Sequence, residues 1–222
     1  MTRRTNARLA GFFFLFYIAT GLSAMVLMGR ATSGQGIPAK LASIAQHASD
    51  VRLAVLLMLL GCFSALVLAV TLYALTRDED PELAMLALTC RVGEGVIGAA
   101  GLPKALGLLS VAAAGAGASA ADASAANVLG AFLLMPDSVS ATFFAVGSTL
   151  FSCLFLRARS IPVPLAWLGV LASLLLVATL PLQLSGVLKG PLTSYIWMPM
   201  LGFELVLALW LLVKGVAAAG TR

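Results

Sequence analysis

Charged side chains are scarce in this sequence of 222 residues. Asp, Glu, Lys and Arg together make up 10% of the chain, whereas a soluble domain carries about a quarter. Apolar residues make up 61%, and the mean hydropathy is +1.04. So few charges cannot cover a water-soluble surface, which excludes soluble, secreted, fibrous, disordered and nucleic-acid-binding proteins. The composition predicts a single integral-membrane domain over residues 1–222.

Histidine and cysteine are also rare. The cysteines Cys62, Cys90 and Cys153 fall within apolar runs, without the spacing of a zinc site or a disulfide framework, so we expect buried thiols. His47 is the single histidine, and a solvated or capping role is favoured over a pH sensor. We therefore expect no metal and no cofactor, which leaves carboxylates as the strong acid–base groups.

Long apolar runs predict transmembrane helices, because a spanning helix needs about 20 mostly apolar residues. The runs are continuous and do not alternate as transmembrane strands do. The predicted fold class is therefore an all-α polytopic membrane helix bundle with six transmembrane helices. The six predicted spans are residues 9–28, 51–76, 83–102, 139–156, 165–185 and 197–213.

Apolar sequence continues beyond the third span, through Pro103 and Lys104 to residue 121. We predict one long helix that is kinked or ended near Pro103, because a two-residue hairpin would leave too little chain for reversal. Seven spans is the alternative. Residues 115–127 are predicted to form an exposed loop, and residues 128–135 an interfacial segment. Residues 37–50 are predicted to form a short interfacial helix in the first outer loop.

The distribution of Lys and Arg predicts the orientation. Eight of the 14 basic residues fall on the side of the N-terminus, five fall on the other side, and Arg91 lies within a span. The positive-inside rule therefore predicts a multi-pass protein of the bacterial inner (plasma) membrane with both termini cytoplasmic. The first apolar run is predicted to be a span rather than a signal peptide, because it exceeds the usual signal core.

Residues 93–98, GEGVIG, match the dinucleotide-binding pattern G-x-G-x-x-G. A dinucleotide site needs a strand before the glycines and a helix after them, whereas this match lies within a predicted span. Close packing between helices is the favoured interpretation, since glycine lets backbones approach.

Three charged residues inside the spans carry the functional argument. If the third span begins at Glu82, Arg91 lies about 13 Å and Glu94 about 18 Å along it, at 1.5 Å per residue. Glu204 precedes Lys214 by ten residues, or about 15 Å. A lone charge at such a depth costs at least about 2.5 to 3.5 kcal/mol, so we expect these three to meet inside the bundle.

The predicted catalytic residues are therefore Glu94, Glu204 and Arg91. One guanidinium cannot neutralise two carboxylates, so we expect one carboxyl to hold a proton. We predict that Arg91 and Glu204 form the closer pair and that Glu94 titrates. Further polar residues of the spans are predicted to bind substrate: Tyr17, Ser64, Thr149 and Gln183.

A second polar group lies at the predicted outer membrane surface. Arg30, Asp50 and Arg52 are expected to form an interfacial cluster. A solvated rim is favoured over a contact with an anionic headgroup or substrate.

Four segments carry a family resemblance. They read ARLAGF at residues 7–12, RVGEGV at 91–96, RARSIPVPLAWLG at 157–169 and ELVLALWLLVKG at 204–215. In this order and spacing, the chain resembles a bacterial family of multi-span membrane proteins catalogued as a domain of unknown function, number 4386. The resemblance implies a compact helical membrane domain and brings no established activity or cofactor.

Three functions follow from the charged site. The first is an intramembrane enzyme whose acid–base chemistry isomerises or cyclises an apolar isoprenoid- or sterol-like lipid. The second is a proton- or cation-coupled small transporter or channel. The third is a non-catalytic sensor or partner subunit whose buried charges fix helix register. The expected partners are the lipid bilayer, an apolar small molecule and further copies of the chain, but no nucleic acid.

Overall fold

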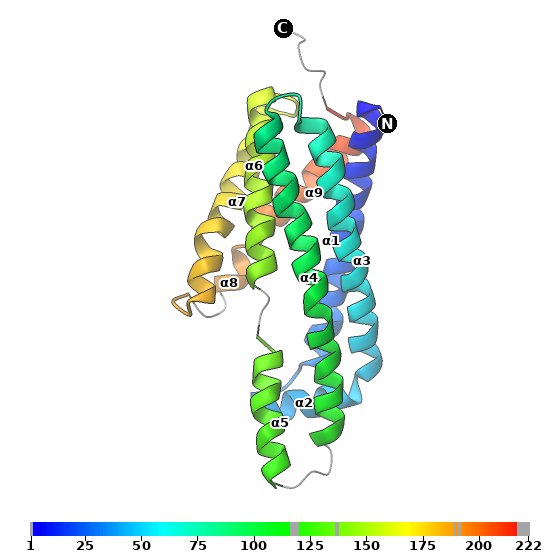
Figure 1. Cartoon of the computed structure of the whole chain (residues 1–222), viewed down its shortest axis with the longest axis vertical. Helices are drawn as coiled ribbons and strands as arrows, with labels where there is room; N and C mark the ends of the chain where they lie inside the picture. Colours follow the sequence, from blue (N-terminus) through cyan, green and yellow to red (C-terminus); the bar gives the residue numbers. More distant parts are fainter. Residues whose placement is uncertain (1, 116–119, 136–137, 189, 191, 217–222) are drawn as a thin grey trace. The chain divides into compact units, whose positions relative to one another are not determined.

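The computed structural model describes residues 2–115, 120–135, 138–188, 190 and 192–216, and all regular secondary structure in these ranges is helical (Figure 1). The all-α prediction is confirmed. The helices are α1 (Arg3–Ala31), α2 (Gly36–Gln46), α3 (Ala48–Thr76), α4 (Pro81–Gly115), α5 (Ala120–Leu133), α6 (Ser138–Ala158), α7 (Val163–Leu184), α8 (Leu192–Tyr195) and α9 (Met198–Val213).

Within the described ranges, five helical segments are long and apolar enough to cross a membrane. They are Arg3–Ala31, Ala48–Thr76, Pro81–Ala114, Asp122–Ala158 and Val163–Leu184. The described part of the fourth comprises most of α5 and all of α6. Helix α9 is apolar but shorter. These lengths and compositions are those of a multi-pass membrane protein.

Helix α4 continues through Pro103 to Gly115. The prediction of one long helix is confirmed, and the helix does not end near Pro103. The prediction of a loop at residues 115–127 is wrong from Ala120 onward, where α5 begins. Residues 116–119 lie outside the described ranges. Alanine has the highest helix propensity, and Asp122 in the first turn favours a helix start, so the small residues form a helix rather than a loop.

The chain forms two compact units. Unit 1 comprises residues 1–18, 62–97 and 138–222, and unit 2 comprises residues 19–61 and 98–137. Helices α1, α3 and α4 contribute residues to both units.

In unit 1, α6 packs along α7, and α7 packs against α9. Gly169 on α7 permits this close approach. A Cβ atom at Gly169 would lie 2.5 Å from the Phe203 ring and 2.6 Å from Ser152 Oγ, whereas a Cβ at Gly202 would meet nothing within 4 Å. Small residues at contacts allow helix backbones to approach in membrane proteins.

Ion pairs gather the ends of several helices at one end of unit 1. Arg3 Nη1 lies 3.4 Å from Asp78 Oδ2, and Arg157 Nη1 lies 3.1 Å from Asp80 Oδ2. Asp80 also caps α4, because its Oδ1 accepts a hydrogen bond of 3.1 Å from the Leu83 backbone N–H. The Leu83 N–H and then the Arg157 guanidinium hold the pKa of Asp80 below its ordinary value.

In unit 2, α2 packs against α5. A Cβ at Gly130 would lie 3.1 Å from side-chain carbons of Ile37 and Leu41, so this contact is also close. The region predicted as an interfacial helix is α2 followed by the start of α3. His47 is the C-cap residue of α2, and its Nδ1 lies 2.9 Å from the Ser43 carbonyl oxygen, as expected for a capping role.

Candidate functional site

The three predicted catalytic residues all belong to unit 1, and all are buried. Arg91 and Glu94 lie three positions apart on α4, and Glu204 lies on α9. Their exposed fractions are 1%, 5% and 5%. Helix α4 and helix α9 are almost entirely apolar around these positions, so the charges depend on one another and on nearby polar groups for stabilisation.

Arg91 pairs with Glu94. Its Nη1 lies 3.0 Å from Glu94 Oε2, and the Tyr17 hydroxyl donates a hydrogen bond of 2.7 Å to Glu94 Oε1. Glu204 forms no ion pair within the described part of the chain. The prediction that Arg91 and Glu204 form the closer pair is therefore wrong. Positions i and i+3 share one helix face, so Arg91 meets Glu94 without crossing a helix interface.

Helix α6 holds the Arg91 side chain in place. The Arg91 guanidinium carbon lies 4.8 Å from the centroid of the Phe144 ring and 5.7 Å from that of Tyr17. A Cβ at Gly147 would lie 3.1 Å from Arg91 Cγ, so the absence of a side chain there leaves room for the arginine stem. Both rings stabilise the cation through their negative faces.

Sequence reasoning missed Phe144 and Gly147. Their i, i+3 spacing places them on one face of α6, and helical periodicity is the signal that groups them. No feature of the sequence pairs that face of α6 with Arg91 rather than with another helix.

Arg91 and Glu204 both line a cavity in unit 1. Its volume is about 10 Å³. The walls include four phenylalanines and two serines: Phe14, Phe151, Phe155, Phe203, Ser148 and Ser152. A space of this size suits about one water molecule.

Several polar atoms of the site have no hydrogen-bond partner within the described residues. They are the three guanidinium nitrogens of Arg91, Glu94 Oε2 and Glu204 Oε1. The contact between Arg91 and Glu94 is thus a close ion pair rather than an aligned hydrogen bond. Buried polar atoms nearly always have a partner, from the protein or from ordered water.

The four residues predicted to bind substrate lie on four different helices, α1, α3, α6 and α7. Tyr17 contacts both Arg91 and Glu94. Ser64 is buried on α3, and Thr149 donates a hydrogen bond to a backbone carbonyl of its own helix. Gln183 lies near the end of α7, with a buried Nε2 that lacks a partner among the described residues. Of these four, none lines the cavity beside Glu204.

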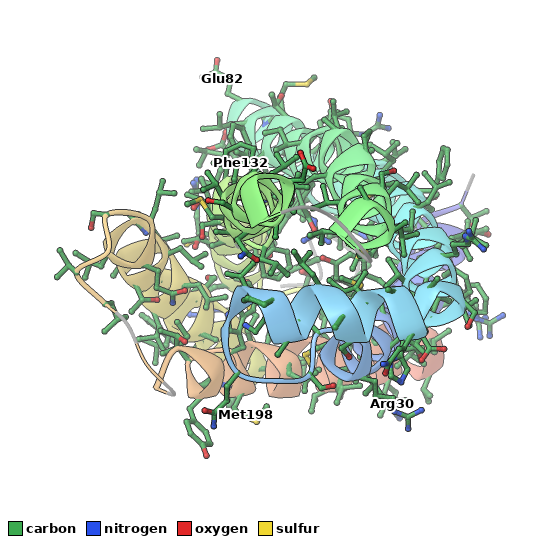
Figure 2. All side chains as sticks on the ribbon, turned by 90° about the horizontal axis from the view of Figure 1, so that it is seen from below. Arg30, Glu82, Phe132 and Met198 are labelled. Atoms are coloured by element: carbon green, nitrogen blue, oxygen red, sulfur yellow. The ribbon has the colours of Figure 1, made fainter. Side chains whose placement is uncertain are left out.

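The predicted interfacial cluster is not joined by contacts. Arg30 and Arg52 are exposed, Asp50 is half-buried, and the described residues include no ion pair among the three. The Arg30 side chain points outward at the surface (Figure 2). Exposed charges gain little from pairing in water, so the absence of ion pairs among these residues costs little stability.

Gly93 and Gly95, two of the three glycines in the G-x-G-x-x-G match, pack against neighbouring helices. A Cβ at Gly95 would lie 3.1 Å from the Cys62 backbone oxygen, and one at Gly93 would lie 2.7 Å from the Phe143 ring. The match lies inside α4, so the packing interpretation is confirmed. Among the described residues, no group of three or more His, Cys, Asp and Glu side chains could hold a metal ion.

These features define the class: a helical multi-pass membrane protein with a buried arginine–glutamate pair. Within this class, the family model described as a domain of unknown function (DUF4386) matches residues 9–215, and the chain belongs to this family. The resemblance drawn from the sequence is confirmed. No curated protein and no solved structure matches the chain.

Proposed function

We propose that this protein binds and releases a proton at Glu204, and that the buried group of Arg91, Glu94 and Glu204 is the coupling site of a small transporter or channel. The unpartnered Glu204 Oε1 beside the cavity carries this proposal. Ionisable residues inside membrane spans commonly mark proton or ion pathways.

The charge balance supports Glu204 rather than Glu94 as the proton-binding group. Glu94 has a cation at 3.0 Å and accepts a hydrogen bond from Tyr17, both of which favour its ionised form. Glu204 has neither contact. A buried carboxylate without a direct ion pair or hydrogen bond is costly, whereas the neutral acid is tolerated.

The size of the cavity favours a proton over a lipid substrate. The cavity volume of about 10 Å³ has room for a single water. An isoprenoid or sterol-like molecule would fit there only if the helices moved. A proton, by contrast, needs only a carboxyl oxygen and a water to carry it.

Proton counting on purified full-length protein tests the proposal. Wild-type protein in detergent should take up about one proton more than Glu204→Gln on acidification from about pH 8 to pH 5. Glu82→Gln is the control, since this exposed carboxyl at the start of α4 is outside the site (Figure 2). Equal proton uptake by wild type and Glu204→Gln would reject Glu204 as the proton-binding group. The Arg91–Glu94 pair would then be better explained as fixing helix register in a sensor or partner subunit.

Acid–base catalysis on an apolar lipid is the second candidate. The aromatic walls of the cavity favour it, because phenylalanine rings tolerate an apolar substrate and stabilise developing positive charge. Such an enzyme would have to open the cavity to admit an isoprenoid- or sterol-like molecule. Lipid extraction and mass spectrometry of the purified protein test this candidate. Specific enrichment of an isoprenoid or sterol-like lipid would favour it, provided that the lipid is lost in a Phe155→Trp variant, whose larger side chain fills the cavity.

We also propose six spans, with both termini in the cytoplasm of a bacterium and the chain in its inner membrane. The start of α1, the α3–α4 turn and the end of α6 share the end of unit 1 that holds the Arg3 and Arg157 ion pairs. A Cβ at Gly215, just after α9, would lie 3.8 Å from Ala7 Cβ. These contacts support an even number of crossings, and labelling of single cysteines placed near residues 3, 78 and 157 from each side tests them.

The proposed partners are the bilayer and further copies of the chain. Large apolar side chains face outward, for example Met198, which is 56% exposed, and Phe132, which is 60% exposed (Figure 2). Such surfaces suit contact with lipid tails. Measuring the mass of the protein in nanodiscs distinguishes a monomer from a homo-oligomer.

A further inference from the structure

The cavity lined by Arg91 and Glu204 is small, and both residues carry polar atoms without a hydrogen-bond partner among the described residues. It has room for one water, and both charged side chains that line it are more than nine-tenths buried. The three nitrogens of Arg91 and Oε1 of Glu204 lack hydrogen-bond partners among the described residues. Most of the lining is apolar, but Arg91, Glu204, Ser148 and Ser152 also belong to it. A cavity of this size holds a water where two to four polar groups face it.

We infer that this cavity binds one ordered water molecule, which accepts a hydrogen bond from the Arg91 guanidinium and donates one to Glu204 Oε1. The inference rests on the proposed function for its role, since the water then carries the proton to and from Glu204. The hydroxyls of Ser148 and Ser152 line the same cavity and offer further hydrogen bonds. A water with two to four such partners is a stable part of a protein interior.

The water also explains how one arginine serves two acids. Arg91 lies directly against Glu94 and reaches no acceptor on Glu204. A bridging water passes the polarisation of the guanidinium to Glu204 without a second ion pair. Hydrogen-bonded chains in a low-dielectric interior strengthen one another, so the water couples the protonation of Glu204 to the Arg91–Glu94 pair.

Infrared difference spectroscopy between about pH 8 and pH 5 tests the inference on full-length protein in lipid vesicles. The carboxyl C=O band of Glu204 is assigned by its loss in Glu204→Gln. In wild type we expect a water O–H stretching band that moves to lower frequency in H₂¹⁸O. Ser148→Val fills the space, so this band should disappear and the Glu204 C=O band should move to higher frequency as its hydrogen bond is lost. Ser148→Ala is the matched control, because it leaves the space open.

The possible outcomes test the water site and the proton-binding role of Glu204 separately. An isotope-sensitive water band without a titrating carboxyl would support the water site and reject the proposed function. A titrating Glu204 without an isotope-sensitive band would overturn the water site. Unchanged spectra in a folded Ser148→Val protein would overturn it too. If Ser148→Val fails to fold, the wild-type H₂¹⁸O measurement still decides the question.

Discussion

Replacing Arg91 by methionine tests the buried ion pair most directly. Methionine retains an unbranched stem beside Gly147 and removes the charge that faces Glu94. The variant leaves two buried carboxyls without a cation. Arg91→Met should be much less stable than wild type near pH 7, and the loss of stability should shrink as the pH falls.

The magnitude follows from the burial of the pair, at 1% and 6% side-chain exposure. Removing one partner of a buried ion pair costs about 3 to 5 kcal/mol. The stranded carboxylate can avoid this cost by taking up a proton. Protonating a carboxyl of ordinary pKa, about 4.3, costs about 3.7 kcal/mol at pH 7 and about 1 kcal/mol at pH 5. In the variant, the folded state binds more protons than the unfolded state, so its stability increases as the pH decreases.

Reversible unfolding in mixed micelles, followed by circular dichroism near pH 7 and near pH 5, measures the difference. Arg157→Met is the control, because the Arg157 side chain is 52% exposed and its ion pairs are worth only about 0 to 1 kcal/mol. The double variant Arg91→Met/Glu94→Gln should recover most of the lost stability. A loss no larger than that of Arg157→Met, or one that does not change with pH, would refute the reasoning.

Three further predictions concern separate contacts. Tyr17→Phe keeps the ring and removes the donor to Glu94, so thermal unfolding should show a loss of about 1.5 to 3 kcal/mol; no loss would contradict the hydrogen bond. Because the pKa of Asp80 is lowered in the folded protein, its stabilising contribution is present above the unfolded pKa and is lost as the pH falls through the folded value. The stability difference between wild type and Asp80→Asn should therefore vanish in acid, and a constant difference would contradict this. Gly169→Ala overpacks a helix contact and should cost about 1 to 3 kcal/mol, whereas Gly202→Ala should be neutral or stabilising; equal effects in chemical unfolding would refute the assigned contact.

Most of the helices could be predicted from the sequence, because apolar run length alone identifies a membrane span. The continuation of α4 through Pro103 followed from the lack of chain for a hairpin. The error at α5 arose because alanine, serine and asparagine are small or polar enough to suggest a loop, while alanine strongly favours helix. Hydropathy measures transfer into lipid, not helix propensity, and the two criteria disagree for this segment.

The residues of the candidate site could be predicted from the sequence, but which acid pairs with Arg91 could not. Depth along the helices brought Arg91, Glu94 and Glu204 to a common level, and burial agrees with an interior position for all three. Depth contains no information on the rotation of α9 about its axis, so it could not decide which acid approaches Arg91. The Tyr17 donor and the Phe144 ring belong to other helices, and their contacts depend on how those helices pack.

The two acids differ in what they contribute to stability, and this difference supports a functional role for Glu204. Glu94 is held by Arg91 and Tyr17, so its charge is matched by its surroundings. Glu204 is buried without an ion pair in the described part of the chain, and apolar side chains form most of the cavity beside it. An apolar residue at that position would fold at least as well, since burying an unmatched acid is unfavourable. Folding therefore does not account for a carboxyl at residue 204, whereas reversible proton binding requires one.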